Sequence, residues 1–391
     1  MQFDDRTFLF SASITMVILS IVLLSMRRST LQTTHGLGIF ASANFMGILG
    51  SSLIGLRGTI PFSLSYFSGN FTIMMSGFLY VFAVRAFDGK PSPRLFFFLA
   101  AIFCGVAMLG VDSFGSQAAR IALTNGVLGA ATLYSGALLA SVGASARTLT
   151  FNRIFCSLGF LGGSIACLAR TATVFNGETT ELFSKTSTSA IFYLAASIMT
   201  SIFTLGFIML VNQRTHDRLL YLATHDPLTG ALTRGAFMEI ARLAMAQSAA
   251  DSKPLALFIA DLDHFKRVND SFGHQIGDQA LRNFVQAAHE SLRKTDVLAR
   301  YGGEEFVVLL PDTNLTDAIG IAELLRSVTR SSVAPVELGS NPVTVSIGVA
   351  STGAQPTDVE SLIALADNAL YASKAHGRNR VSAAPVAHSE P

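Results

Sequence analysis

Two glycines followed by two adjacent glutamates, Gly302-Gly303-Glu304-Glu305, are the residues of this chain best suited to do chemistry. They lie between two apolar stretches rich in strand-forming residues, so the pattern predicts a β-hairpin with the glycines at its tip. Glycine adopts positive φ readily and lets a ligand approach the backbone. Two neighbouring carboxylates at a turn need a cation or a basic partner, so this tip is a candidate metal or phosphate site.

A further carboxylate, Asp261, directly follows the apolar run 255–260, which has the pattern of a buried strand. If that strand neighbours the hairpin, Asp261 and Glu304 converge, and hard oxygen ligands with a nearby backbone carbonyl suit Mg²⁺. A divalent ion on carboxylates, without a Cys or His cluster, indicates phosphoryl or nucleotidyl transfer. These residues alone leave an equal alternative, in which Asp261 and Asp263 cap a turn and the glutamates are only solvated.

The elements that must position these residues begin near residue 225, where the pattern becomes that of a soluble domain. Helical periodicity alternates with strand periodicity, the helices at 232–246, 278–292, 316–328 and 362–374 and the strands at 255–260, 297–299, 306–310 and 343–350. This mixed order predicts an α+β domain with an antiparallel-rich mixed sheet flanked by helices. About 165 residues suffice for one domain with its own core.

The first half of the chain is apolar. Of the 391 residues 50% are hydrophobic and only 14% are charged, and most of the charge lies after residue 212. Seven segments have about the length needed to cross a bilayer, at 8–26, 36–56, 60–84, 95–114, 121–143, 154–172 and 187–211. The third is the weakest, because Pro61 and several serines dilute its start. The first is predicted to be a retained span and not a signal peptide, because Asp4 and Asp5 precede it. We therefore predict an all-α transmembrane bundle of about seven helices.

The basic residues of the connecting loops predict the orientation. Alternate loops hold most of them, namely Arg27, Arg28, Arg85, Lys90, Arg94, Arg147, Arg153, Arg214 and Arg218. The opposite loops hold fewer, namely Arg6, Arg57, Arg120, Arg170 and Lys185. Because cytoplasmic loops are the richer in Lys and Arg, the N-terminus is predicted to lie outside and the C-terminal half in the cytoplasm.

The membrane half lacks the features of a transporter. Few ionisable residues lie deep within its spans, which favours a sensor or an anchor. Its outer loops are short, so a ligand would have to bind among the helices, unless the signal is the state of the membrane itself. Gly159 and Gly163 predict close packing of two helices. The last span is predicted to continue as a helix through 212–224, with Leu219 and Leu222 as a short apolar stripe, either to transmit a signal or as a passive linker.

Several motifs of the second half together resemble the GGDEF family of diguanylate cyclases. The hairpin is present as Gly302-Gly303-Glu304-Glu305-Phe306, a variant with Glu at the third position. The other motifs stand in the family's order, as 261–270, Phe272-Gly273-His274, Gly277-Asp278, Ser346-Ile347-Gly348-Val349-Ala350, Ala366-Asp367, Ala369-Leu370-Tyr371 and 374–379. The resemblance covers residues 225–382.

The resemblance implies a role for each matching residue. Asp261, the backbone carbonyl of Leu262 and Glu304 would hold Mg²⁺, with Mn²⁺ as an alternative, and Glu304 or Glu305 would help to deprotonate the attacking hydroxyl. GTP would be bound by Gly302 and Gly303 on the hairpin, by Asn269, His274 and Asp278 around guanine, and by Lys374 and Arg378 on the phosphates. The last two are spaced i to i+4, which predicts one helix face. Asp278 can accept hydrogen bonds from guanine that adenine does not offer.

The implied reaction condenses two GTP molecules into cyclic di-3′,5′-GMP with release of two pyrophosphates. One such domain holds one GTP, so catalysis would need a homodimer with two-fold symmetry. The implied setting is the inner membrane of a bacterium, with the lipid bilayer and cyclic di-GMP as further partners and with no nucleic acid. The predicted domains are a membrane region at 1–211, a helical linker at 212–224, the cyclase domain at 225–382 and a disordered tail at 383–391.

A second ligand site is implied by Arg293-Lys294-Thr295-Asp296, an RxxD whose Asp296 stands shortly before the hairpin. In the family this spacing marks a site of product inhibition, and a guanidinium fork suits guanine edges and phosphates. The opening motif departs from the family at Ala231, Thr233 and Gly235, which predicts weaker local packing and hydrogen bonding without loss of a metal contact. The alternatives are a catalytically inactive cyclic di-GMP receptor and a transporter with a nucleotide-binding tail.

Overall fold

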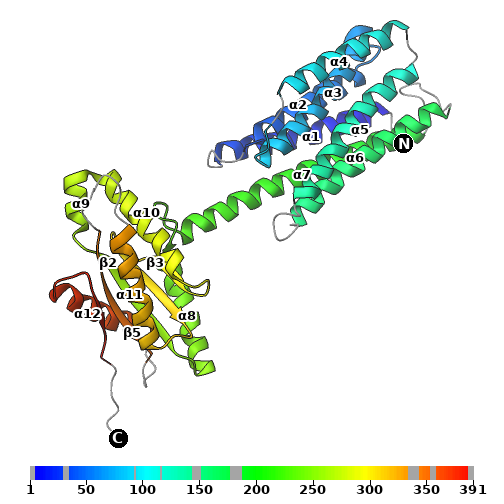
Figure 1. The fold of residues 1–391 in the computed structure, drawn as a ribbon. Coiled ribbons are helices and arrows are strands. Elements are labelled where there is room, and N and C mark those ends of the chain that lie inside the picture. Colours follow the sequence, from blue (N-terminus) through cyan, green and yellow to red (C-terminus); the bar gives the residue numbers. More distant parts are fainter. Residues whose placement is uncertain are drawn as a thin grey trace. The chain divides into compact units, whose positions relative to one another are not determined.

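The computed structural model describes residues 5–29, 35–91, 94–114, 117–142, 151–176, 187–332, 343–352 and 358–385. These residues form two compact units, Met1–Asp217 and Arg218–Pro391. Figure 1 shows a helical first unit and a second unit built around a sheet. The loops that carry Arg147 and Lys185 lie outside the described residues.

The first unit is helical throughout its described part. Its elements are α1 (Asp5–Ser29), α2 (Leu37–Gly55), the π-helix η1 (Leu64–Ser68), α3 (Gly69–Phe87), α4 (Arg94–Phe114), α5 (Gln117–Val142), α6 (Phe151–Phe175) and α7 (Ser187–Thr224). Within the described residues, five helical stretches are long and apolar enough to cross a membrane, at 37–55, 64–87, 117–141, 151–175 and 191–224. The apolar stretches of α1 and α4 are shorter, 13–26 and 97–111. The apolar helical character is confirmed, and the count of seven spans stays a prediction.

Aromatic rings and close helix contacts hold this unit together. Phe40 stacks on Phe207 with ring centroids 4.0 Å apart, and Phe160 stacks on Phe203 at 4.4 Å. A methyl group on Gly159 would lie 2.6 Å from the backbone nitrogen of Phe203, so this glycine lets α6 approach α7 as expected.

Gly163 does not share that role. A methyl group there would meet no atom within 4 Å among the described residues. The expectation that Gly163 serves close helix packing is therefore wrong, because its position on α6 faces a cavity and not a neighbouring helix.

The second unit contains a six-stranded mixed sheet in the order β1-β3-β4-β2-β5-β6. The strands are β1 (Leu232–Thr233), β2 (Leu255–Leu262), β3 (Val297–Arg300), β4 (Glu305–Pro311), β5 (Val345–Ser351) and β6 (Val381–Ala383). The four central strands pair antiparallel, whereas β1 on β3 and β6 on β5 pair parallel. The expected α+β fold with an antiparallel-rich mixed sheet is confirmed.

Helices cover both faces of this sheet, so β2 is buried along its whole length. One face packs Phe258 and its even-numbered neighbours on α10 (His274–Ser291) and α11 (Leu315–Ser332). The other face packs Leu257 and its odd-numbered neighbours on α8 (Arg234–Asp251) and α12 (Val359–Ala375). Because side chains alternate along a strand, Asp261 falls on the side of α12.

Some local expectations are corrected. The periodicity at 232–246 begins as strand β1, and α9 (Phe265–Phe272) and β6 were not expected. Thr233 does not weaken hydrogen bonding, because its hydroxyl accepts from Ala236 N at 3.4 Å as the N-cap of α8 and donates to Ala223 O at 3.2 Å. Ala231 is buried in the core, and a methyl group on Gly235 would meet no described atom within 4 Å. The expected weak packing is thus not found at Ala231, and for Gly235, which has open space around it, it stays a prediction.

Candidate active site at the end of strand β2

The antiparallel pairing of β2 with β4 brings the predicted carboxylates together. Asp261 lies opposite Glu305 in the register, and Leu262 N donates to Glu304 O at 3.3 Å. Asp261 is only 6% exposed. Burial raises the pKa of Asp261 and of Glu304, and the charge of Asp261 raises the pKa of Glu304 further. Asp261 and Glu304 are therefore close enough to repel each other, as two ligands of one cation would be.

Lys374, at the end of α12, partly offsets this negative charge. Its Nζ lies 2.8 Å from Asp261 Oδ2. Burial raises the pKa of Asp261, and the charge and hydrogen bond of Lys374 lower it in part. The helix can lie close to the sheet because β5 has a glycine beneath it. A methyl group on Gly348 would overlap the carbonyl oxygen of Ala366 and the nitrogen of Leu370. The absence of a side chain at Gly348 thus allows the approach that places Lys374 beside Asp261.

Asp263 has a different task, although it is two residues from Asp261. Its carboxylate accepts hydrogen bonds from Ser346 Oγ at 2.7 Å, Thr344 Oγ1 at 2.8 Å and Asn379 N at 3.0 Å. These bonds tie the end of β2 to β5 and to the segment after α12. Asp263 is therefore a structural carboxylate, as the alternative of a turn cap implied. It does not cap a turn, because the partners of its carboxylate are far away in the sequence.

The hairpin tip is held by Arg300, which the sequence did not single out. Both Tyr301 N and Gly302 N donate to Glu305 O, at 2.8 and 3.1 Å. The Arg300 guanidinium donates to Gly303 O at 2.6 Å and also to Asp226 Oδ1 at 3.0 Å. This bridge fixes the glycines against the opening motif of the domain.

Asp226 is tuned for this bridge. Burial alone would raise its pKa, but hydrogen bonds from Thr229 and Arg300 outweigh burial and lower it. The sequence shows Asp226 and Arg300 as a carboxylate and a guanidinium. It does not show that they pair, because 74 positions separate them.

Arg378 reaches the site by another route than expected. Helix α12 ends at Ala375, Gly377 follows with φ +108°, and Arg378 itself has φ +62°. Lys374 and Arg378 therefore do not share a helix face, because the chain leaves the helix between them at a glycine that favours this conformation. The Arg378 charge nevertheless lowers the pKa of Asp261. Both cations thus lie near the carboxylates.

The residues expected to read guanine lie at the junction of α9 and α10. Asn269 is near the end of α9, and Asp278 is in the second turn of α10. The Asn269 side-chain oxygen lies against Gly277, where a methyl group would overlap it. Asn269 and Asp278 are half-buried, and His274 is exposed at the start of α10. The fold brings these three residues to one edge of the domain.

The RxxD segment forms a tight turn between α10 and β3. Asp296 Oδ2 accepts from Arg293 N at 2.8 Å, and Asp296 N donates to Arg293 O at 3.1 Å. The side chain of Arg293 is exposed. Asp296 therefore shapes the turn, and the turn presents the Arg293 guanidinium to solvent.

The residues at the end of β2 suit a divalent cation. Within the described residues, no group of three Asp, Glu, His or Cys side chains is disposed to hold a metal. The expected set differs from such a group, because it consists of two carboxylates and the Leu262 carbonyl. Two desolvated carboxylates with raised pKa values leave negative charge to be neutralised, and oxygen donors are the ligands that Mg²⁺ prefers. With Lys374 and Arg378 beside them, these groups can bind a metal-bound polyphosphate.

Comparison with known proteins shows what the second half of the chain is similar to. Residues 223–380 match the family model described as "Diguanylate cyclase, GGDEF domain". The chain is 40% identical over 167 residues to the response regulator PleD of Caulobacter vibrioides, covering 42% of this chain and 37% of PleD. It is also 40% identical over 174 residues to the diguanylate cyclase DgcM of Escherichia coli, covering 44% of this chain and 41% of DgcM. The matches thus span well under half of either relative.

Two solved structures also align with part of this chain. The GGDEF domain of DgcB from Caulobacter crescentus, crystallised with c-di-GMP, is 34% identical and aligns over 41% of this chain and 93% of that domain, with a TM-score of 0.38. The GGEEF domain of a diguanylate cyclase from Vibrio cholerae is 28% identical over 39% of this chain and 97% of that domain, also with a TM-score of 0.38.

Proposed function

Residues 223–380 of the chain form a GGDEF domain, and from this premise we propose that the protein is a membrane-bound diguanylate cyclase. It condenses two GTP molecules into cyclic di-GMP and two pyrophosphates. The observation that carries the proposal is the meeting of Asp261, Glu304 and Lys374 at the end of β2. A catalytically inactive receptor would have no need of this cluster of close, desolvated charges.

The reaction consists of two equivalent nucleotidyl transfers. The 3′-hydroxyl oxygen of one GTP forms a bond to the α-phosphorus of the other, and the bond from that phosphorus to the pyrophosphate oxygen breaks. The hydroxyl proton passes to a carboxylate, for which Glu304 and Glu305 are the candidates. The raised pKa of Glu304 suits a group that must accept a proton near neutral pH.

A divalent ion held by Asp261, the Leu262 carbonyl and Glu304 would supply charge neutralisation of the phosphates. Lys374 and Arg378 would orient the phosphate oxygens as direct donors. Asn269 and Asp278 would select guanine, because Asp278 accepts from N–H groups that adenine lacks. The hairpin glycines, held by Arg300, would let the triphosphate lie against the backbone.

The two nucleotides must face each other across two protomers, so the cyclase acts as a homodimer. The end of α7 is suited to support it, because Leu219 and Leu222 are exposed on the described helix. The apolar helices of the first unit would anchor the protein in the inner membrane, with the GGDEF domain in the cytoplasm.

The proposal is tested with full-length protein in nanodiscs, GTP and Mg²⁺, by measuring cyclic di-GMP. Glu304→Gln keeps the size of the side chain and is expected to lower the rate at least about 100-fold. The matched control is Glu239→Gln, an exposed position on α8, which should keep the rate of the unchanged protein. Absence of product from the unchanged protein with GTP and either Mg²⁺ or Mn²⁺ would overturn the proposal.

The exposed Arg293 supports a second part of the proposal, that cyclic di-GMP inhibits the enzyme at the RxxD turn. Arg293→Ala removes the guanidinium without touching the turn, since the turn uses the backbone of Arg293. We expect inhibition by added cyclic di-GMP to weaken at least about tenfold. Lys294→Ala, the exposed neighbour, is the control. An unchanged inhibition curve for Arg293→Ala would rule this site out.

A further inference from the structure

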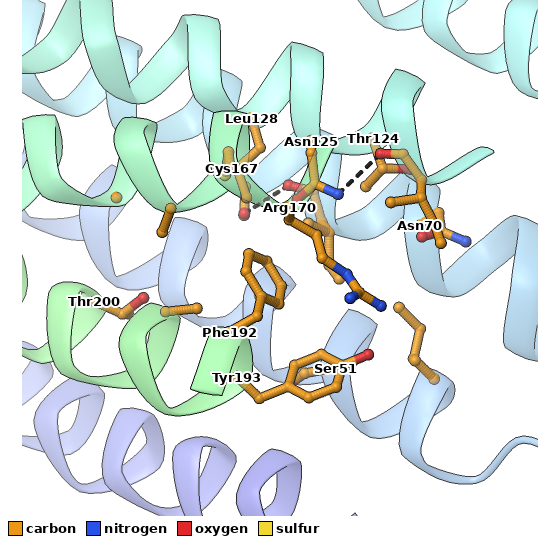
Figure 2. A pocket seen from close by; sticks show the side chains of 18 of the residues that line it. Ser51, Asn70, Thr124, Asn125, Leu128, Cys167, Arg170, Phe192, Tyr193 and Thr200 are labelled. Atoms are coloured by element: carbon orange, nitrogen blue, oxygen red, sulfur yellow. Dashed lines mark hydrogen bonds between the residues drawn. The ribbon is translucent and has the colours of Figure 1, made fainter. Parts of the chain in front are cut away.

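A cavity of about 210 Å³ lies among the helices of the first unit. Its walls come from α1, α2, η1, α3, α5, α6 and α7. Figure 2 shows Arg170 extending between the helix that carries Thr124 and Asn125 and the helix that carries Phe192 and Tyr193. The volume is below the roughly 300–1,000 Å³ of pockets for drug-sized ligands, so the space suits a smaller molecule.

Three arginines line this cavity, namely Arg57, Arg120 and Arg170. They are three of the five basic residues that the sequence places on the side predicted to face away from the cytoplasm. That side is normally poor in Lys and Arg. These exceptions to the charge rule come from three separate helix ends, and the fold gathers them around one space.

Aromatic rings hold the three guanidinium groups. The Arg57 guanidinium carbon lies 3.0 Å from the centroid of the Tyr66 ring, and that of Arg120 lies 5.3 Å from the same centroid. Arg170 is 5.6 Å from the centroid of the Phe192 ring and is only 5% exposed. Such stacking orients the plane of a guanidinium against the face of the ring.

The charge of the cavity is of one sign. Among the described residues, no Asp or Glu lines it. Burial, together with the nearby charge of Arg120, lowers the pKa of Arg57 to about 10. Arg57 therefore stays protonated at neutral pH. The arrangement thus holds positive charges against their mutual repulsion, and an anion would relieve that repulsion.

The remaining lining combines polar groups near the arginines with apolar groups. Thr124 is 6% exposed, and its hydroxyl has no hydrogen-bond partner among the described residues. Asn70 and Asn125 also line the cavity, and Ile73, Leu128 and Phe203 give it apolar walls. A ligand that fits has one anionic group and a compact apolar body.

We propose that this cavity binds a small organic monocarboxylate with an apolar body, and that this class of molecule is the ligand of the membrane unit. The carboxylate accepts hydrogen bonds from the arginines in the planar geometry that a guanidinium fork matches. Ligand binding does not depend on the proposed cyclase activity. It would control the cyclase because the cavity wall includes α7, the helix that continues to Thr224.

The test measures binding to full-length protein in phosphatidylcholine nanodiscs by calorimetry, with benzoate and hexanoate as probes. Benzyl alcohol and 1-hexanol are the neutral controls of similar shape. We expect saturable binding of at least one acid and none of its alcohol. Arg170→Gln should weaken binding at least about tenfold, which is the loss of one charge-assisted pair. Arg218→Gln, an exposed arginine outside the cavity, should leave it unchanged.

If Arg170→Gln does not fold, Arg120→Lys provides the same test, because it keeps the charge and removes the fork. Binding of neither acid, equal binding of acid and alcohol, or less than a twofold change in the arginine variant would overturn the proposal. Nanodiscs that contain phosphatidylglycerol distinguish the source of the anion. Loss of acid binding in those discs would show that a lipid phosphate occupies the cavity, which also contradicts a soluble carboxylate as ligand. A protein that binds benzoate but forms no cyclic di-GMP would separate this proposal from the cyclase proposal.

Discussion

The end of strand β2 and the cavity of the first unit carry opposite charges, but both bring charged groups of the same sign close together. Asp261 and Glu304 bring two carboxylates together. Burial raises the pKa of both, and the charge of Asp261 raises the pKa of Glu304 further. The cavity brings three guanidinium groups, those of Arg57, Arg120 and Arg170, into one space. In each region the fold brings charges of the same sign close together, although Lys374 and Arg378 partly offset the carboxylates at the end of β2. Such a group lowers stability unless a ligand of the other sign is bound.

Elsewhere the charges of both units are matched. In the first unit Arg153 donates to both oxygens of Asp88, at 2.9 and 3.1 Å. In the second unit Arg300 donates to both oxygens of Asp226, at 3.0 and 3.2 Å. The difference between matched ion pairs and groups of like charge separates residues that stabilise the fold from residues that are suited to bind a ligand. Removing one charge of a matched pair should destabilise the protein, whereas removing one charge of a like-signed group should stabilise it.

The largest effect is expected at Asp88. Its side chain is 1% exposed and that of Arg153 is 13% exposed, so Asp88→Asn leaves a buried cation without its counter-charge. Such a change costs about 3–5 kcal/mol. Unfolding of the full-length protein in nanodiscs measures it, with Asp217→Asn at an exposed position as the control. A loss below about 1 kcal/mol would show that the pair is not a structural one.

A smaller loss, about 1–3 kcal/mol, is expected for Asp226→Asn, because hydrogen bonds to a charged group are lost from a partly buried site. The pKa of Asp226 is lowered in the folded state. Its stabilisation is therefore complete above the usual carboxyl pKa of about 4 and disappears as the pH falls through the folded value. Stability curves of the two proteins should approach each other below pH 4, and a constant gap would contradict the pairing.

The sequence predicted what depends on local patterns. The alternation of strand and helix from residue 225, the apolar helices before it and the approach of Asp261 to Glu304 all follow from periodicity and from one strand pairing. Motif resemblance supplied the other candidate site residues. The spacing of Lys374 and Arg378 led to a wrong placement, because it fits a helix that in fact ends at Ala375.

Contacts between distant segments were beyond the reach of the sequence. Arg300 and Asp226 are ordinary residue types whose pairing appears only when β1 lies beside β3. The arginines of the cavity were read only as a minor charge on the outer loops, because nothing in the sequence says that three helix ends converge. Gly163 was interpreted through its spacing, yet its surroundings are set by helices that are far away in the chain.

A modest gain in stability is expected for Glu304→Gln. The pKa of Glu304 is raised in the folded state, so its ionised form disfavours folding at neutral pH and the penalty is relieved as the pH falls. Because Glu304 is only partly buried, solvent screens the repulsion, and the relief is at most about 1 kcal/mol. A relief of that size would raise the unfolding midpoint of the second unit by roughly 2–4 °C. The gain should shrink when Mg²⁺ and GTP are added, because only the unchanged protein gains from the metal. A lower midpoint for Glu304→Gln without ligands would contradict the picture of a repelling pair.

No measurable change is expected at the exposed pair of Arg242 and Glu360, although its 2.6 Å contact is shorter than either buried pair. Both side chains are more than half exposed, at 59% and 54%, so water and salt screen the attraction and ordering two long side chains offsets it. Glu360→Gln should therefore leave the unfolding midpoint where it is at 0.15 M salt. A clearly lower midpoint for Glu360→Gln would mean that contact distance, and not burial, decides which charge pairs stabilise the fold. Desolvation could then no longer explain the difference between matched pairs and groups of like charge.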